Sequence, residues 1–314
     1  MTAMVILESW SRVAPLGVRF VDDQNGRVIG DGLQVTAWPS AEPSRLRAVP
    51  QGRTNVFYLM NVGGLRDLEF GAGDDAYWAG LPRHLAFTLE VNDRYGRFLP
   101  FRFNTTLPVR GLLRLACGSP STPAPLPAGA EADGVPLFTA PARSNTPGTV
   151  VIRADLWDAA NHVPAAWAML EARTPGARLR GEPPVRALAD HLGRVALHFP
   201  IPDAGDFDGG SFDSPSGGAS GAALGQRTFT VELDALYAHL PPAADTLTRP
   251  LRPIPELCAA LNQPPARLWD RLGGAPVALS QTTLRFGQDT SLRSSNVGSE
   301  PASVLLLTPS QSPP

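Results

Sequence analysis

Short runs of alternating apolar and polar residues are the main pattern along this chain. Ahead of Asp93, the residues Phe87, Leu89 and Val91 occupy every second position, and the residues between them are polar. Alternation with a period of two places one set of side chains on a buried face and predicts a β-strand. The same pattern predicts strands at 18–21, 101–103, 149–155, 165–172, 195–199, 227–233, 282–286 and 303–308. The fold class that follows is mostly β, with antiparallel sheets.

One pentapeptide, Asp-x-x-Gly-Arg, occurs three times between these runs. In each copy, Asp can accept a hydrogen bond from the backbone just ahead of it, and Gly can take the left-handed conformation that closes a three-residue hairpin loop. A looser copy follows Asp158, where Asn161 is predicted to take the left-handed position. The motif therefore predicts structural turns and no chemistry. Its residues are Asp23, Gly26, Arg27, Asp93, Gly96, Arg97, Asp190, Gly193 and Arg194.

A segment without strand pattern divides the chain into two parts. Residues 118–133 are rich in Pro, Ala and Ser and contain almost no large apolar residue, which is typical of an exposed linker. We therefore predict one antiparallel β-sandwich module at 1–117 and a second at 134–309, followed by a short tail at 310–314.

Two further segments of the C-terminal module depart from the strand pattern. Residues 202–226 contain seven glycines and four serines and predict a mobile loop. Between 254 and 272, leucines recur at near-helical spacing and are interrupted by Pro264 and Pro265. This spacing predicts two short helices with a bend, so a short helical segment lies near the C-terminus.

The charge composition narrows the range of partners. The 314-residue chain carries 29 acidic and 27 basic residues and a formal net charge of −2, so it lacks the positive surface that nucleic acid or an anionic membrane would attract. It also lacks an apolar run long enough to span a bilayer. All 27 basic residues are arginine, and the lack of lysine excludes P-loop, Schiff-base and Ser-Lys chemistry. We expect no nucleic-acid partner and no membrane insertion.

The two cysteines and the N-terminal residues bear on location. Cys117 and Cys258 are far apart in sequence and neither belongs to a metal-type pair, so their spacing implies no zinc ribbon and no disulfide framework. We interpret both as small core residues.

Residues 1–12 lack the basic and apolar regions of a secretory signal. The expected location is the cytoplasm, or a particle assembled there and released without a signal peptide.

Candidate reactive groups each have a simpler structural interpretation. Asp206, Asp208 and Asp213 could chelate calcium, but Gly210 and Gly217 stand where an EF-hand needs an oxygen ligand and a glutamate. No Gly-x-Ser-x-Gly elbow is present. The sequence therefore predicts no catalytic residue, no cofactor and no metal site. The five histidines are His84, His162, His191, His198 and His239. No two of them have the spacing that places two metal ligands on one helix face.

Residues 16–37 resemble the opening hairpin of carboxypeptidase-regulatory-like or transthyretin-like β-sandwich modules. In those modules, a strand, an Asp-x-x-Gly turn and a second strand begin the fold, and the same order occurs here. The resemblance implies an Ig-like or transthyretin-like sandwich of a kind that is usually a non-catalytic attachment. The expected later strand at 55–62 is apolar enough, but Gly63 and Gly64 end it abruptly.

A broader resemblance covers residues 87–108, 150–172 and 284–309. These segments are similar to uncharacterised structural proteins encoded with bacterial phage-tail-like contractile injection systems. The resemblance implies a non-catalytic structural or adaptor subunit that docks onto other protein subunits of a larger assembly. Exposed strand edges could serve for docking by β-augmentation. Possible interface anchors are Trp10, Trp38 and Trp78.

Two other functions remain open from the sequence. A carbohydrate- or ligand-binding β-module would present exposed aromatic side chains, for which Tyr77 and Trp78 are candidates. An unrecognised hydrolase would instead need a histidine, an aspartate and a serine that converge in the fold.

Overall fold

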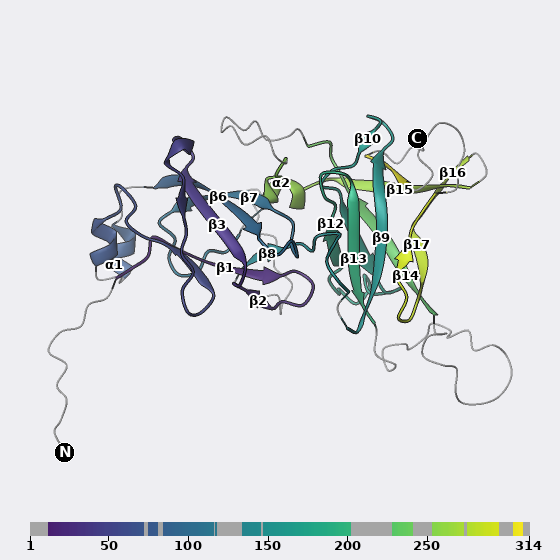
Figure 1. Cartoon of the computed structure of the whole chain (residues 1–314), viewed down its shortest axis with the longest axis horizontal. Helices are drawn as coiled ribbons and strands as arrows, with labels where there is room; N and C mark the ends of the chain where they lie inside the picture. Colours follow the sequence, from purple (N-terminus) through teal and green to yellow (C-terminus); the bar gives the residue numbers. More distant parts are fainter. Residues whose placement is uncertain are drawn as a thin grey trace, which may run out of the picture.

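A computed structural model shows two β-sandwich modules that lie end to end along the long axis of the molecule (Figure 1). Strands dominate and helices are short, which confirms the prediction of a mostly β fold with antiparallel sheets. The described residues are 12–71, 75–80, 84–115, 117, 134–145, 147–201, 228–240, 253–272, 275–294 and 304–309. The predicted linker at 118–133, the glycine loop at 202–226 and the tail at 310–314 lie outside them.

The N-terminal module contains two four-stranded sheets packed face to face. One sheet has the order β2-β1-β5, and β8 pairs with β1 in parallel; the other has the order β4-β3-β6-β7. Because β8 follows residues 118–133 in the chain, this module takes one strand from beyond the predicted linker. The strands are β1 Leu16–Asp22, β2 Val28–Ile29, β3 Leu33–Pro39, β4 Arg47–Ala48, β5 Val56–Leu59, β6 Leu85–Asp93, β7 Phe101–Leu107 and β8 Val135–Leu137.

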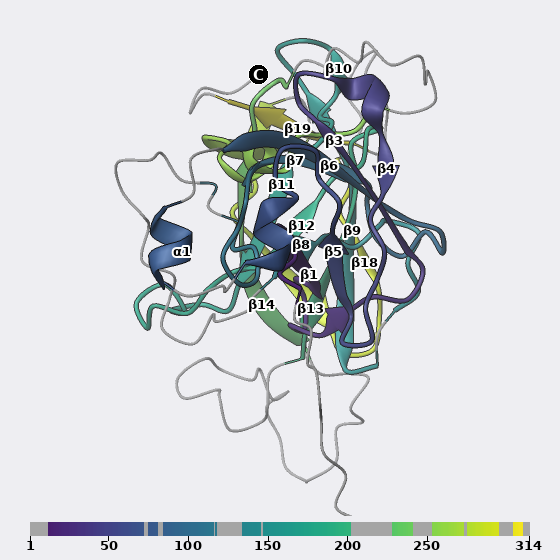
Figure 2. The ribbon, with the colours of Figure 1, turned by 90° about the vertical axis from the view of Figure 1, so that its left-hand side faces the viewer.

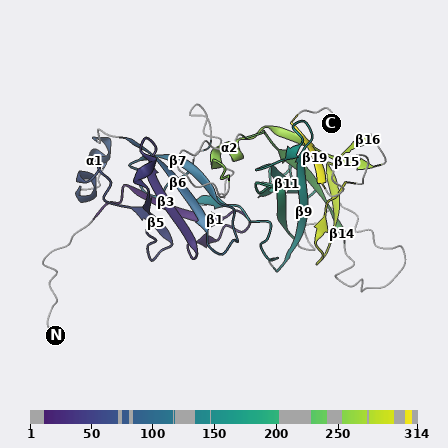
Figure 3. The ribbon, with the colours of Figure 1, turned by 45° about the horizontal axis from the view of Figure 1, so that its top comes forward.

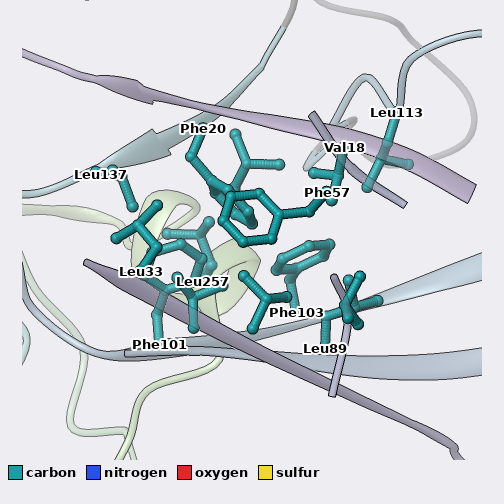
Figure 4. Close-up of a cluster of buried hydrophobic side chains, with 14 of the residues drawn as sticks. Val18, Phe20, Leu33, Phe57, Leu89, Phe101, Phe103, Leu113, Leu137 and Leu257 are labelled. Carbon is teal, nitrogen blue, oxygen red and sulfur yellow. The ribbon is translucent and has the colours of Figure 1, made fainter. Parts of the chain in front are cut away.

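Alternate side chains of these strands fill the space between the sheets, as a period of two requires. Phe20 and Phe57 meet edge to face with ring centroids 5.4 Å apart, and Phe103 is fully buried nearby. Figure 4 shows that Leu257, from the C-terminal part of the chain, also enters this core. The core of the N-terminal module is therefore completed by a segment 120 residues or more beyond its last strand.

The C-terminal module is an 11-stranded sheet that folds over on itself. One half runs along β9 and includes β10, β13, β15, β16, β18 and β19; the other half runs β12-β11-β14-β17. Strand β15 pairs with both β14 and β19 and so joins the halves. The strands are β9 Thr149–Asp158, β10 Val163–Pro164, β11 Met169–Arg173, β12 Val185–Leu188, β13 Arg194–Pro200, β14 Thr228–Leu236, β15 Pro265–Leu272, β16 Ala275–Ala278, β17 Gln281–Arg285, β18 Thr290–Ser291 and β19 Val304–Thr308.

The prediction of two helices between 254 and 272 is wrong in its second half. The first helix exists as α2, Leu257–Leu261, and the side chain of Glu256 caps it. Residues 265–272 form β15, because consecutive prolines favour extended backbone and strands β14 and β19 offer pairing partners. Leu268 and Trp269 are then buried on opposite faces. The remaining helical turns are η1 Pro43–Arg45, η2 Asp67–Phe70 and α1 Asp75–Ala79.

The interpretation of the cysteines as two separate core residues is also wrong. Cys117 and Cys258 form a disulfide with their Cα atoms 4.8 Å apart, and both residues are half-buried. The bond joins the segment after β7 to α2. Sequence spacing could not show it, because the two cysteines are 141 positions apart and only the fold brings them together.

The second and third pentapeptides close tight turns. Gly96 and Gly193 have positive φ angles of 66° and 75°. The carboxylate of Asp93 accepts the backbone N–H of Arg97 at 2.7 Å, and the carboxylate of Asp190 accepts that of Arg194 at 3.0 Å. Each arginine side chain also returns to the aspartate of its own turn.

The first and the fourth turns differ from the expected geometry. Gly26 has a φ of 66°, but Asp22 receives the turn hydrogen bonds, including one from the Gln24 N–H at 3.1 Å. Asp23 is free to point elsewhere because this loop is one residue longer. In the looser turn after Asp158, the left-handed residue is His162, with a φ of 55°, in place of the expected Asn161.

Candidate functional site

A cleft of ≈ 1560 Å³ lies between the two modules. The outer face of the β3–β6–β7 sheet forms one wall, and β9 with the third turn forms the other. Figure 3 shows β7 and β9 in neighbouring lobes with α2 between them. The cleft exceeds the volume of about 300–1,000 Å³ that is usual for a small-molecule pocket. Its size fits a segment of polypeptide better than a single small ligand.

The wall from the N-terminal module is a paired, rigid surface. Strand register places Glu90 directly opposite Arg102, and both side chains point away from the core. Arg102 Nε donates to Glu90 Oε2 at 2.8 Å, and its guanidinium lies 5.6 Å from the centroid of the Trp38 ring. Trp38 is only 6% exposed, and Arg102 lies over its ring. Of the three tryptophans expected as anchors, this one therefore lies in the cleft as a covered wall residue.

The wall from the C-terminal module contains a strained tryptophan. Trp167 has a φ of 63°, which is unfavourable for a bulky side chain and is found where surrounding structure enforces it. Here Gln263 Nε2 donates to the Trp167 carbonyl oxygen at 2.7 Å, and the Trp167 ring lies 6.4 Å from that of His191. Trp167 also packs against the core of the N-terminal module. The strain is thus maintained at the junction of the modules.

Two exposed leucines project from opposite walls of the cleft. Leu46, between η1 and β4, is 50% exposed, and Leu192, at the tip of the third turn, is 48% exposed. Beside Leu192, Asp190 and Arg194 pair with each other at 2.7 Å. Since many of the charged groups are neutralised within their own wall, the exposed apolar side chains are the groups that an occupant would contact most favourably.

An ion pair joins the two modules: Asp23 of the first turn accepts from Arg186 of β12 at 2.6 Å. The neighbouring Asp22 accepts at 2.9 Å from Arg143, which lies in the segment that connects β8 to β9. Burial raises the pKa of Asp23 above its usual range, although the charge of Arg186 opposes this shift. The extra residue in the first turn therefore supplies an acidic group that bonds to the other module.

His198 is a buried polar residue close to the same junction. It is 1% exposed, and neither ring nitrogen has a hydrogen-bond partner among the described residues. Burial and the charges of Arg143 and Arg153 lower its pKa to about 4, while Asp22 and Asp289 act in the opposite direction. His198 is therefore neutral at physiological pH.

We expect the His198→Leu variant to lose part of the acid sensitivity of the protein. An unfolded histidine, with a pKa near 6.5, takes up a proton before the folded one, so the free energy of unfolding falls with decreasing pH until about pH 4. Between about pH 7 and pH 5, the wild-type protein should lose about 2 kcal/mol of its free energy of unfolding through His198. The leucine variant should not show this loss. Urea titrations at a series of pH values measure this difference. The exposed His84, changed to Gln, is the control; an equal effect there would refute the role of burial.

The structure brings together no catalytic set among the residues that it describes. The five histidines are spread over both modules, and none of them bonds to a serine within those ranges. The described residues also hold no group of three His, Cys, Asp or Glu placed to share a metal ion. The aspartates weighed as calcium ligands, 206, 208 and 213, lie outside the described residues, as does Trp10.

The aromatic pair considered for ligand binding lies away from the cleft. Tyr77 and Trp78 belong to α1, at the outer end of the N-terminal module (Figures 1 and 2). Trp78 is half-buried there.

Within the part of the chain that the structure describes, no helix is long and apolar enough to cross a bilayer.

Comparison with known proteins adds little to this geometry. No protein-family model matches the chain, and no curated protein matches it. Two solved structures of the shaft pilin spaA from Lactobacillus rhamnosus GG, one of them a point mutant, share 10% identity with it. The alignment covers 95% of this chain and 98% of the pilin, but the TM-score is 0.20. An overlap at this TM-score does not establish a common fold.

Proposed function

We propose that this chain is a non-catalytic structural or adaptor subunit that docks onto other protein subunits through the cleft between its modules. The observation that carries the proposal is the cleft itself, which is large, has an exposed leucine on each wall and contains charged pairs, such as Glu90–Arg102 and Asp190–Arg194, that are formed within one wall. Such a surface suits a polypeptide partner with apolar side chains.

The assembly that we propose is a phage-tail-like contractile injection particle. This part of the proposal rests on the resemblance of residues 87–108, 150–172 and 284–309 to proteins encoded with such systems. A subunit in a particle must keep a defined shape under load. The disulfide and the Asp23–Arg186 ion pair suit that requirement, because they restrain the junction between the two modules.

A carbohydrate-binding function has weaker support. Sugar recognition by aromatic stacking needs a free ring face, and the two cleft tryptophans, Trp38 and Trp167, are 6% and 5% exposed. A neighbouring cation covers Trp38, and the His191 ring lies against Trp167. Neither ring therefore offers a stacking platform in this structure.

The docking proposal predicts that charges on the two exposed leucines will release the partner. We expect the Leu46→Glu and Leu192→Glu double variant to fold normally, because exposed substitutions change stability by about 0.5 kcal/mol or less. Burying two unpaired carboxylates in an interface should lower retention of co-purifying subunits by about tenfold or more. The measurement is affinity purification from native lysate, with quantitative mass spectrometry and electron microscopy of the eluate.

Leu179→Glu provides a matched control, because Leu179 is 95% exposed and lies outside the cleft. This variant should retain the partner and the tubular or needle-shaped particles. Equal retention by the double variant would show that the cleft is not the docking surface. Elution of the wild-type protein as a monomer with no partner would refute the adaptor function.

A further inference from the structure

The disulfide lies at a point where both modules meet one short segment. This segment, residues 253–263, belongs by sequence to the C-terminal module, yet Leu257 and Ala260 of α2 are fully buried in the core of the N-terminal module. Cys258 lies between them on the helix and bonds to Cys117. The cross-link therefore fastens the segment onto the N-terminal module.

The same segment makes hydrogen bonds to both modules. The backbone N–H of Arg102, on β7, donates to the carbonyl oxygen of Pro255 at 2.9 Å. On the other side, Gln263 is 6% exposed, and its Nε2 donates to the carbonyl oxygen of Trp167 at 2.7 Å. Its Oε1 accepts the N–H of Ala238 at 2.9 Å. The segment thus connects the two walls of the junction.

We propose that Cys117–Cys258 is a thiol-controlled clasp that holds residues 253–263 against the N-terminal module and so sets the junction between the modules. A helix of five residues is too short to be stable alone, because helix nucleation is unfavourable. Its position therefore depends on packing and on the cross-link. Loss of the bond should loosen α2 first.

Formation of the Cys117–Cys258 bond from two thiols requires only exchange with a small disulfide such as oxidised glutathione. The thiolate of one cysteine attacks that disulfide, a mixed disulfide forms, and one glutathione thiolate leaves. The second cysteine thiolate then attacks the protein sulfur of the mixed disulfide and releases the second glutathione. Two electrons pass from the protein thiols to the small disulfide, which becomes two thiols. Both cysteines are half-buried, so a small reagent has access to them.

The clasp makes the thiol or disulfide state of the two cysteines depend on the redox conditions around the protein. A reducing cytoplasm keeps such thiols free, whereas an oxidising exterior favours the closed form. Pro253 and Ile254 line the cleft only a few residues before Cys258. If the clasp opens, this part of the wall loosens, so partner docking should depend on redox state; this last consequence rests on the proposed function.

Hydrogen exchange with and without dithiothreitol tests the clasp directly. In the full-length protein, amides of residues 256–262 should exchange about tenfold faster or more after reduction, while those of β9 and β13 stay unchanged. The Cys117→Ser and Cys258→Ser double variant should show the fast exchange without reductant and should not respond to it. Alkylation followed by mass measurement gives the number of free thiols in each sample.

Two results would overturn the clasp. One is the presence of two alkylated cysteines in protein prepared under oxidising conditions, and the other is unchanged exchange of α2 after complete reduction. Partner retention, measured on the same samples, separates the two proposals. If α2 loosens but retention of the partner is unaffected, the clasp stands and the redox dependence of docking is refuted; loss of retention in the Leu46→Glu and Leu192→Glu double variant tests the docking role of the cleft separately.

Discussion

Replacing Gly193 with alanine is expected to lower the free energy of unfolding by about 4 kcal/mol, of which about 1–2 comes from the left-handed backbone and the rest from steric overlap. Gly193 has a φ of 75°, and an added Cβ would overlap the carbonyl oxygen of Leu156 and lie 3.2 Å from the N–H of Ala165. The backbones cannot move apart freely, because the Leu156 N–H donates to the Gly193 carbonyl oxygen at 2.8 Å. A urea titration followed by tryptophan fluorescence measures the loss.

The other two copies of the motif provide matched controls for this prediction. Gly26 and Gly96 also have positive φ, but an added Cβ at either position would meet nothing within 4 Å. Their alanine variants should lose only the backbone contribution of about 1–2 kcal/mol. If all three variants lost the same stability, close approach to β9 would not be the cause.

Asp158→Ala should also destabilise the protein strongly, by about 3 kcal/mol. The Asp158 carboxylate is fully buried at the end of β9 and accepts hydrogen bonds from Tyr237 Oη and Asn161 Nδ2, both at 2.7 Å. Alanine leaves the buried Tyr237 hydroxyl without this partner. Tyr237→Phe, which removes a single bond to a charged group, should cost about 1.5–2 kcal/mol. The double variant should lose less than the sum, because both changes remove the same bond.

The contribution of Asp158 to the free energy of unfolding depends on pH. Burial by itself would raise the pKa of Asp158, but the hydrogen bonds from Asn161, Tyr237 and the turn backbone outweigh it and lower the pKa below 3.8. The stabilisation is therefore complete above the unfolded pKa and disappears as the pH falls through the folded one. The stability difference between wild type and Asp158→Ala should narrow below about pH 4. Asp155→Ala, an exposed change on the same strand, should have little effect.

Local patterns predicted the strands well and the turns with small errors. Alternation around Leu89 predicted β6, and similar alternation around Leu197 predicted β13. At the first turn, the sequence cannot distinguish the adjacent aspartates Asp22 and Asp23. Only the length of the loop decides which of them accepts the turn hydrogen bonds. In the fourth turn, His162 takes the position expected for Asn161, because the Asn161 side chain bonds to Asp158.

Leucine spacing misled the prediction at β15. Leu268 would lie on the same helix face as Leu261 and Leu272, yet the residues from Pro265 onwards pair with β14 and β19. Pairing with strands 29 or more positions away outweighs a weak local preference. No spacing rule indicated the cleft, because its walls come from strands of two different modules that only the fold places side by side.

By itself, the sequence determined the mostly β fold class, strands with clear alternation such as β6 and β13, and the positive φ of the three motif glycines, because each of these depends on residues within about five positions of one another. Only the tertiary structure decided that Cys117 meets Cys258, that α2 completes the other module's core and that two walls enclose a cleft. Those contacts arise when apolar faces that are remote in sequence bury each other, and burial of this kind depends on shape rather than on sequence separation.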